Sequence, residues 1–268
     1  MNVLIGIGDS WTSGIGGIPD YEKPANYPDD RNYFYWHGED LDKIPNYINK
    51  ELTSSWVNKL ASKLNVVPIN LGVPGSGNKG PIKSLHLNDI AWNNINGGYL
   101  IYMLSTRIRF DLFDRSDIEE LQNSHQRPFY TITLPDEEAD PVSYEKHTWW
   151  YKNIYSESIA NNTTIMSILE AQHVSKLKNL KFYFCFAFED CSELMNTNKL
   201  SSKIDWDRCL TKNTSFLKIL ADLQNTPDII EYYNQLNNST EYISKCGHPT
   251  SNGYSYIADY MFDQIIEK

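Results

Sequence analysis

Four short apolar segments recur along the chain, and each is followed by a turn of small or polar residues. These segments are residues 3–7, 66–71, 99–104 and 180–188. Stretches with apolar residues at helical spacing lie between and after them, at 54–64, 156–176, 215–224 and 253–266. Strands that alternate with helices form parallel β-α-β units, whose sheet is covered on both faces. The pattern therefore predicts an α/β fold, a three-layer α/β/α sandwich with a mostly parallel sheet.

Two long stretches, at about 19–52 and 111–150, lack such periodicity and are predicted to be large loop insertions in a single domain of residues 1–268. Both are rich in aromatic residues, which are Tyr21, Tyr27, Tyr33, Phe34, Tyr35, Trp36 and Tyr47 in the first and Tyr144, Trp149 and Trp150 in the second, with Tyr151 and Tyr155 just beyond it. Such rings suit a sugar or a protein partner, because each has an apolar face and several have a polar edge. Packing of the insertions onto the sheet also explains them.

Charge and composition exclude several classes of partner. The chain has 24 Lys and Arg against 34 Asp and Glu, a net charge of −10, which argues against a nucleic-acid partner. No run approaches the roughly 18 apolar residues of a membrane span, and no signal peptide is visible. We therefore expect no membrane partner and a cytoplasmic or virion-associated location. The four cysteines lack zinc-site spacing and have no histidines placed beside them for zinc, so we expect no metal.

Polar and glycine-rich segments follow the first three predicted strands. They are Gly8-Asp9-Ser10, the loop 72–78, and Ser105-Thr106-Arg107. The carboxyl ends of parallel strands meet at one edge of a sheet, where chemistry gathers. A serine at such a strand end can project its hydroxyl beside backbone N–H groups that stabilise an oxyanion. A late histidine, His248, stands immediately before the last predicted helix.

Other glycine motifs do not fit. Gly6 and Gly8 would need a third glycine at position 11 for a dinucleotide-binding fingerprint, and Trp11 is there. No phosphate-binding Gly-x-x-x-x-Gly-Lys-Ser/Thr loop is present. The Gly-x-Ser-x-Gly elbow of α/β-hydrolases is also absent around Ser10, where Thr12 takes the final position.

An early serine, a glycine-rich loop after Asn70 and a late histidine are in the chain order of the SGNH (GDSL-type) hydrolases, which this sequence resembles from residue 3 to the last helix. The resemblance implies an SGNH/flavodoxin-like fold and hydrolysis of an ester without a cofactor. It implies Ser10 as the nucleophile, the N–H of Gly75 in the oxyanion hole and His248 as the general base.

Two positions depart from the family pattern. The usual asparagine after the third strand falls at Thr106, whose hydroxyl can still donate to the oxyanion. The usual acid three residues before the histidine falls at Lys245, which cannot orient an imidazole. Either a backbone carbonyl holds His248 in a Ser–His dyad, or a carboxylate from elsewhere does so, for which Glu241 is a candidate by proximity in sequence.

Two further residues are candidates for substrate binding. Arg107 follows the third strand and either clamps an anionic or hydroxyl-rich substrate or forms a salt bridge. Asn78 either ties the second loop to the site by side-chain hydrogen bonds or serves only in a turn. We expect a serine esterase that removes an acyl group, such as acetyl, from a carbohydrate. The alternative is a non-catalytic glycan- or protein-binding module on the same fold, for example in a viral particle.

Overall fold

The computed structural model describes residues 1–15, 17, 53–87, 90, 92–112, 130–132, 141–190, 192–196, 199–225, 240–244 and 247–267. Its centre is a four-stranded sheet made of β1 (Asn2–Gly8), β2 (Val67–Gly72), β3 (Gly97–Leu104) and β6 (Lys181–Phe186). Every neighbouring pair in it is parallel. The four strands predicted from the apolar segments are thus confirmed, with ends shifted by at most a few residues.

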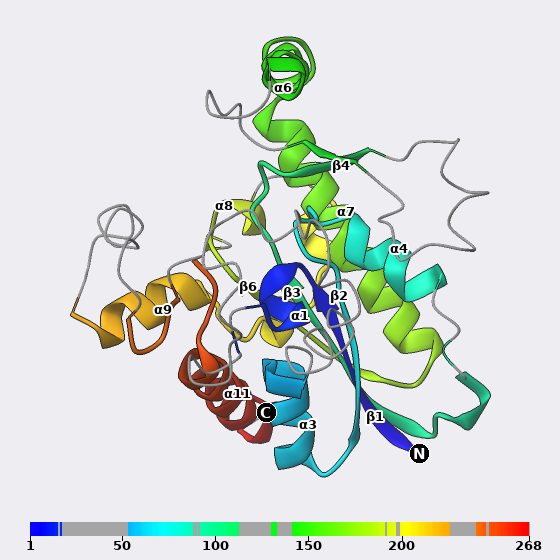
Figure 1. The fold of residues 1–268 in the computed structure, drawn as a ribbon. Helices are drawn as coiled ribbons and strands as arrows, with labels where there is room; N and C mark the ends of the chain where they lie inside the picture. The colour runs from blue at the N-terminus through cyan, green and yellow to red at the C-terminus, as the bar shows by residue number, and fades with distance from the viewer. Residues whose placement is uncertain are drawn as a thin grey trace, which may run out of the picture.

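Helices cover both faces of this sheet (Figure 1). One face packs against α3 (Trp56–Leu64), α9 (Phe216–Leu223) and α11 (Ser251–Ile266). The other packs against α4 (Gly80–Leu87) and α7 (Glu157–Leu177). Successive strand side chains point to opposite faces, so Leu4 contributes to the first core while Val3 and Ile5 contribute to the second. The predicted three-layer α/β/α fold is confirmed.

Local sequence signals set the ends of these helices. Ser156, Ser215 and Thr250 precede α7, α9 and α11, and each side chain accepts a hydrogen bond from a backbone N–H of the first turn. Helix α3 ends at Asn65, which adopts the left-handed conformation with a φ of 54°. The helices predicted at 54–64, 156–176, 215–224 and 253–266 are therefore present.

The strand order β2-β1-β3-β6 creates a switch point in the topology. The chain passes from β1 to β2 on one side and then crosses to β3 on the other side of β1. In open α/β sheets ligands bind outside the carboxyl ends of strands where the connections diverge in this way. That point lies between the carboxyl ends of β1 and β3, and Ser10 follows the first of them after one intervening residue, Asp9.

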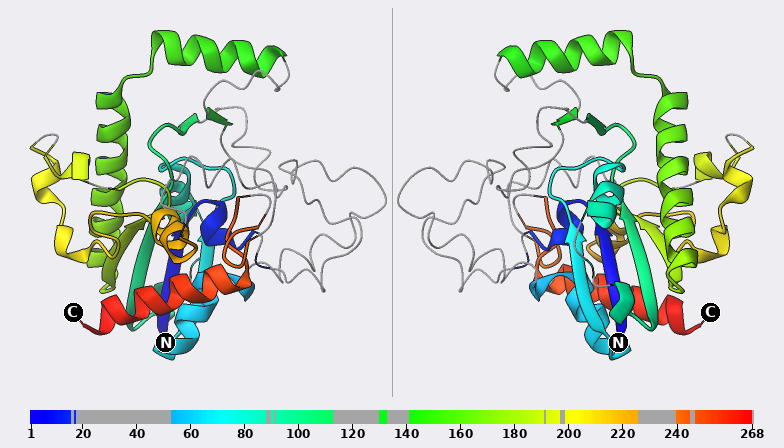
Figure 2. Two further views of the ribbon diagram at one scale, coloured as in Figure 1. Left: turned by 90° about the vertical axis from the view of Figure 1, so that its left-hand side faces the viewer. Right: turned by 90° about the vertical axis from the view of Figure 1, so that its right-hand side faces the viewer.

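The second predicted insertion contains regular structure that the sequence pattern did not predict. It holds β4 (Phe110–Leu112), β5 (Tyr130–Ile132) and helix α6 (Pro141–Asn153), which lies across the end of α7 (Figure 2). In α6 the aromatic residues spread around the helix, so no apolar face at helical spacing is present in the sequence. The first predicted insertion, residues 19–52, lies outside the described residues.

Short helical segments complete the described secondary structure, with α1 at Ser10–Ser13, α8 at Ser192–Met195, and 3-10 turns η3 at Trp92–Asn94, η4 at Ser201–Lys203 and η5 at Trp206–Arg208. Within the described ranges, no helix combines the length and the apolar character needed to cross a membrane.

Candidate active site

Ser10 begins the short helix α1 at the carboxyl end of β1. The preceding Asp9 caps this helix, because its Oδ1 accepts a hydrogen bond from the Trp11 N–H at 3.0 Å. The carbonyl of Ser10 accepts from the N–H of Gly14 at 3.2 Å and from the hydroxyl of Ser13 at 2.9 Å. Ser10 itself is 6% exposed. Its hydroxyl forms no hydrogen bond with another described residue, so the turn fixes its backbone and leaves its side chain available for chemistry.

The loop after β2 is bonded directly to this turn. Asn70 Nδ2 donates to the carbonyl of Thr12 at 2.8 Å, and the N–H of Val73 donates to the carbonyl of Gly8 at 2.8 Å. A side chain at Gly72 would meet the backbone N of Ser13 at 2.3 Å, so only glycine permits this approach. The structure therefore brings together the first two predicted strand-end motifs.

Two backbone N–H groups at this edge are candidates for an oxyanion hole. Gly75 adopts a φ of 70°, a conformation that favours glycine, in the loop after β2. In the part of the chain that the structure describes, neither the N–H of Gly75 nor that of Ser10 donates to another residue. The N–H of Ser10 is unpaired because the first residues of a helix have no acceptor one turn earlier. Both groups can donate to a ligand.

Asn78 ties the second loop to the end of β3. Its Oδ1 accepts from the N–H of Ser105 at 2.8 Å, and its Nδ2 donates to the Thr164 hydroxyl at 3.2 Å. The backbone carbonyl of Asn78 also accepts from the phenol of Tyr102. Burial raises the pKa of that phenol well above its usual range, and the charges of Asp111 and Asp9 raise it further. Asn78 is 2% exposed, so these contacts fit the tying role predicted for it rather than contact with substrate.

A buried carboxylate holds the same loop from the other side. Asp111, in β4, accepts from the N–H of Gly77 at 2.7 Å through Oδ1, and from those of Lys79 and Gly80 at 3.0 and 2.7 Å through Oδ2. These donors lead into the first turn of α4, which has N–H groups without helical acceptors. Asp111 thereby fixes the segment that follows Gly75.

We expect Asp111→Asn to lower the free energy of unfolding by about 1–3 kcal/mol, because the amide keeps one acceptor oxygen and replaces the charged one with a donor. Urea denaturation followed by circular dichroism measures this change. Asp259→Asn is the matched control, since that carboxylate is half exposed and pairs with Lys63 on the surface. The control is expected to cost less than about 1 kcal/mol. Equal losses in the two variants would contradict the role given to Asp111.

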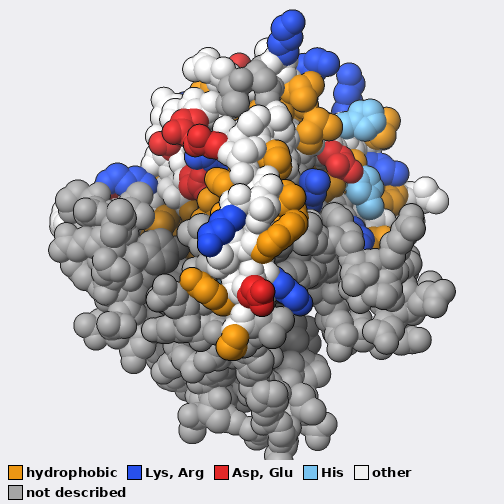
Figure 3. Space-filling view, turned by 90° about the horizontal axis from the view of Figure 1, so that it is seen from above, with side chains coloured by type: hydrophobic (Ala, Val, Ile, Leu, Met, Phe, Trp, Pro, Cys, Tyr) orange, Lys and Arg blue, Asp and Glu red, His pale blue; other side chains and the backbone are white. Residues whose placement is uncertain are grey.

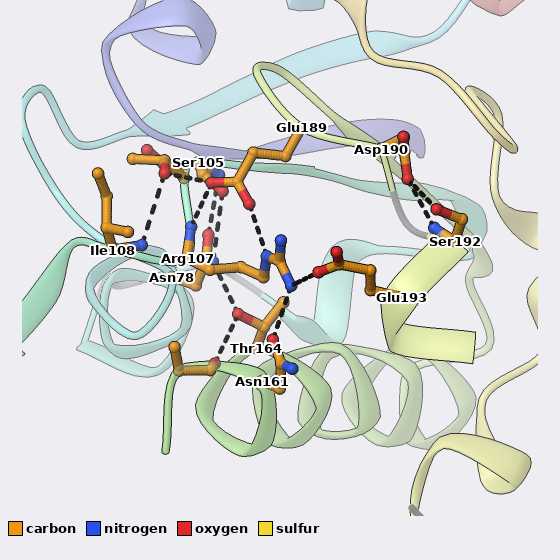
Figure 4. Close-up of polar contacts among 12 residues, drawn as sticks. Asn78, Ser105, Arg107, Ile108, Asn161, Thr164, Glu189, Asp190, Ser192 and Glu193 are labelled. Atoms are coloured by element: carbon orange, nitrogen blue, oxygen red, sulfur yellow. Dashed lines mark hydrogen bonds and ion pairs between the residues drawn. The ribbon is translucent and has the colours of Figure 1, made fainter. Parts of the chain in front are cut away.

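Glu189, which follows β6, bonds to Arg107 (Figure 4) and to Thr106. The Glu189 carboxylate accepts from the hydroxyl of Thr106, from the N–H of Arg107 at 2.9 Å and from its Nε at 2.5 Å. Arg107 Nη1 also donates to Asn161 at 2.8 Å and to Glu193 at 2.9 Å. Burial by itself lowers the pKa of the Arg107 guanidinium, but Glu189 and Glu193 outweigh it and raise the pKa.

These contacts bear on the roles predicted for both residues. Arg107 forms salt bridges within the protein, so the structure explains it without a substrate. The hydroxyl of Thr106 can donate to an oxyanion only if it first leaves Glu189. Glu189 was not predicted as part of the site, because the predicted motifs lie only at the ends of the first three strands. The same criterion applied to the fourth strand, which Glu189 follows closely, could have found it.

His248 precedes α11, and hydrogen bonds hold its backbone. The N–H and the hydroxyl of Ser244 both donate to the carbonyl of His248 at 2.8 Å. One turn into α11, the phenol of Tyr254 donates to the carbonyl of Ile15 at 2.8 Å, which links this helix to the segment after α1. This bond places the first turn of α11 beside Ile15, five residues after Ser10. The structure shows no hydrogen bond from Ser10 to His248.

Glu241, the carboxylate proposed by proximity to orient His248, shows no hydrogen bond to it in the described part of the chain. The Glu241 side chain is exposed and forms no hydrogen bond or ion pair with another described residue, whereas its backbone carbonyl accepts from the Thr250 hydroxyl at 2.6 Å. Lys245 lies outside the described residues.

Within the part that is described, no three His, Cys, Asp or Glu side chains are grouped as a metal site. Seen from above, acidic, basic and apolar side chains are interspersed (Figure 3).

The parallel sheet, its two helical layers and the groups at its switch point define a three-layer α/β/α protein with a candidate site beside Ser10. No family model and no curated protein matches the chain. Among solved structures it is similar to a protein of the G-D-S-L lipolytic family from Desulfitobacterium hafniense DCB-2, at 12% identity and a TM-score of 0.44, over 98% of this chain and 99% of that one.

Two further solved structures are similar at 12% identity. One is a carbohydrate esterase whose active site displays divergent catalytic and non-catalytic binding functions, with a TM-score of 0.45 over 100% of this chain and 65% of that one. The other is an acetyl xylan esterase, with a TM-score of 0.36 over 98% and 99% of the two chains. The fold assignment rests on the described strands and helices themselves.

Proposed function

We propose that this protein is a serine esterase of the SGNH type that removes an acyl group, such as acetyl, from a carbohydrate. One observation carries the proposal. The Ser10 hydroxyl and the N–H groups of Ser10 and Gly75 have no partners among the described residues, and they lie at the carboxyl ends of adjacent strands. A nucleophile beside unpaired backbone donors is the arrangement that acyl transfer requires.

The reaction proceeds in two halves. Ser10 Oγ attacks the ester carbonyl carbon while His248 takes the hydroxyl proton, and the C=O electron pair moves onto oxygen, where the N–H groups of Ser10 and Gly75 stabilise it. The carbon–oxygen bond to the alcohol then breaks, and His248 returns the proton to the leaving alcohol. Water repeats these steps on the acyl-serine, releasing the acid and restoring Ser10. The carbohydrate part of the proposal comes from the aromatic residues of the two predicted insertions.

A non-catalytic glycan-binding module is the second candidate. Two observations favour it: Lys245 stands where the family pattern has an acid, and the Thr106 hydroxyl donates to Glu189.

Acetate release from 4-nitrophenyl acetate and from acetylated xylo-oligosaccharides separates the candidates. An aryl fluorophosphonate, followed by mass spectrometry of the peptide that carries Ser10, detects the nucleophile without turnover. We expect both acetate release and labelling of Ser10 to occur. Absence of both, together with binding of the oligosaccharide, would favour the binding module.

A further inference from the structure

Arg109 lies beside the residues that flank Ser10. Its Nη1 is 3.4 Å from Oδ2 of Asp9, the residue before Ser10. Its guanidinium carbon lies 5.8 Å from the ring centre of Phe188, and that ring packs edge-on against Trp11, the residue after Ser10, at 5.0 Å. A cation–π contact holds the guanidinium over the Phe188 ring. The Arg109 cation is therefore in contact with Asp9 and, through the Phe188 ring, adjoins Trp11, the two residues that flank Ser10.

The two arginines after β3 differ in the number and length of the hydrogen bonds that their guanidinium groups form. Arg107 donates through Nε and Nη1 to two carboxylates and an amide, at 2.5–2.9 Å. Arg109 donates only through Nη1, at 3.4 Å to Asp9 and at 3.4 Å to the hydroxyl of Ser105. Its Nε and Nη2 have no partner among the described residues, and its side chain is 28% exposed. Arg109 therefore has several N–H groups that can donate to a ligand.

Asp9 does not hold Arg109 tightly. Its Oδ1 already accepts from the Trp11 N–H at 3.0 Å, and its Oδ2 already accepts from the Ser105 hydroxyl at 2.9 Å. Charge-assisted bonds between an arginine and a carboxylate are usually about 2.7–2.9 Å long, so the 3.4 Å contact is a loose one. The backbone of Arg109 is better fixed, since its N–H donates to the carbonyl of Thr106 at 3.3 Å and Asp111 anchors the strand beyond it. The base of the side chain is positioned while its tip can adjust.

We propose that Arg109 is a catalytic residue whose guanidinium donates a hydrogen bond to the oxyanion formed when Ser10 attacks the ester. The proposal rests on the proposed function. It assigns the donor from the segment after β3 to Arg109, because the Thr106 hydroxyl donates to Glu189 instead. Arg109 transfers no proton and stays a cation throughout. A charged donor stabilises the developing negative oxygen more than a neutral hydroxyl does.

Kinetics of Arg109→Ala with 4-nitrophenyl acetate test this assignment. We expect kcat to fall by roughly 10²–10³, the usual effect of removing one oxyanion donor. KM is expected to change by less than about threefold, because the interaction forms only in the transition state. Millimolar guanidinium chloride should restore part of the lost kcat, and equal concentrations of tetramethylammonium chloride should not. Arg208→Gln is the matched control, an arginine paired with Asp205 away from the strand ends.

Arg109→Lys keeps a charge beside Asp9 and guards against loss of the fold in the alanine variant. We expect its kcat to fall by roughly tenfold, since a single ammonium group lacks the geometry of the guanidinium. A kcat near that of the wild type in either folded variant, or a lost kcat that guanidinium fails to restore, would overturn the role of Arg109 alone. No ester hydrolysis and no Ser10 labelling in the wild type would overturn the proposed function itself.

Discussion

Ser10→Ala is expected to lower kcat for a short-chain aryl ester by at least about 10³-fold, because a serine and its base act as one unit in acyl transfer. The fold should tolerate the change well. The Ser10 hydroxyl has no hydrogen-bond partner among the described residues, so its removal leaves no buried group unsatisfied there. We expect the thermal midpoint to stay within a few degrees of the wild type, as a change below about 0.5 kcal/mol implies.

The measurement combines initial rates with stoichiometric labelling by the aryl fluorophosphonate. Ser202→Ala is the control, since that hydroxyl is exposed and donates only to the carbonyl of Lys199. The control should keep both the rate and the labelling. Ser10→Ala should lose both while its circular dichroism spectrum is unchanged. Equal rates in Ser10→Ala and the wild type would show that the hydrolysis comes from another group, and the nucleophile would have to be sought elsewhere.

The layers of the fold could be predicted because they follow from local patterns. Residues 3–7 and 180–188 are apolar on both faces, as buried parallel strands are. The predicted helices have apolar residues at helical spacing, and serine or threonine caps precede them. Helices α4 and α6 were not predicted, because their sequences lack such local signals. Helix α4 begins with Gly80-Pro81, which looks like a turn in sequence, and α6 has aromatic residues on several sides.

The candidate site was predictable only in part, because its supports come from distant positions in the chain. Ser10 and Gly75 could be placed since each follows a predicted strand. Asp111 holds Gly77 from 34 residues away, and Glu189 holds Arg107 from 82 residues away. No local pattern encodes such contacts. Arg107 and Arg109 are alike in sequence, and only the positions of Glu189 and Glu193 show which of them is neutralised within the protein.

His248→Ala is expected to lower kcat nearly as far as Ser10→Ala, because the imidazole must take the Ser10 proton and deliver it to the leaving alcohol. His86→Ala is the matched control. His86 is half exposed, and its Nε2 lies 2.9 Å from Glu170 on the surface. The control should hydrolyse the aryl ester at the wild-type rate. Undiminished turnover in His248→Ala would overturn the assignment of the general base.

Lys245→Asp in the same assay tests what orients His248. A backbone carbonyl acceptor fixes the outward N–H of the imidazole and leaves the other nitrogen free for the Ser10 proton. A carboxylate would also stabilise the imidazolium that forms, which a neutral carbonyl does less well. We therefore expect Lys245→Asp to leave kcat unchanged or to raise it, while activity still depends on His248. A large loss in Lys245→Asp, with the fold intact, would mean that the lysine itself supports the reaction and that the dyad is wrong.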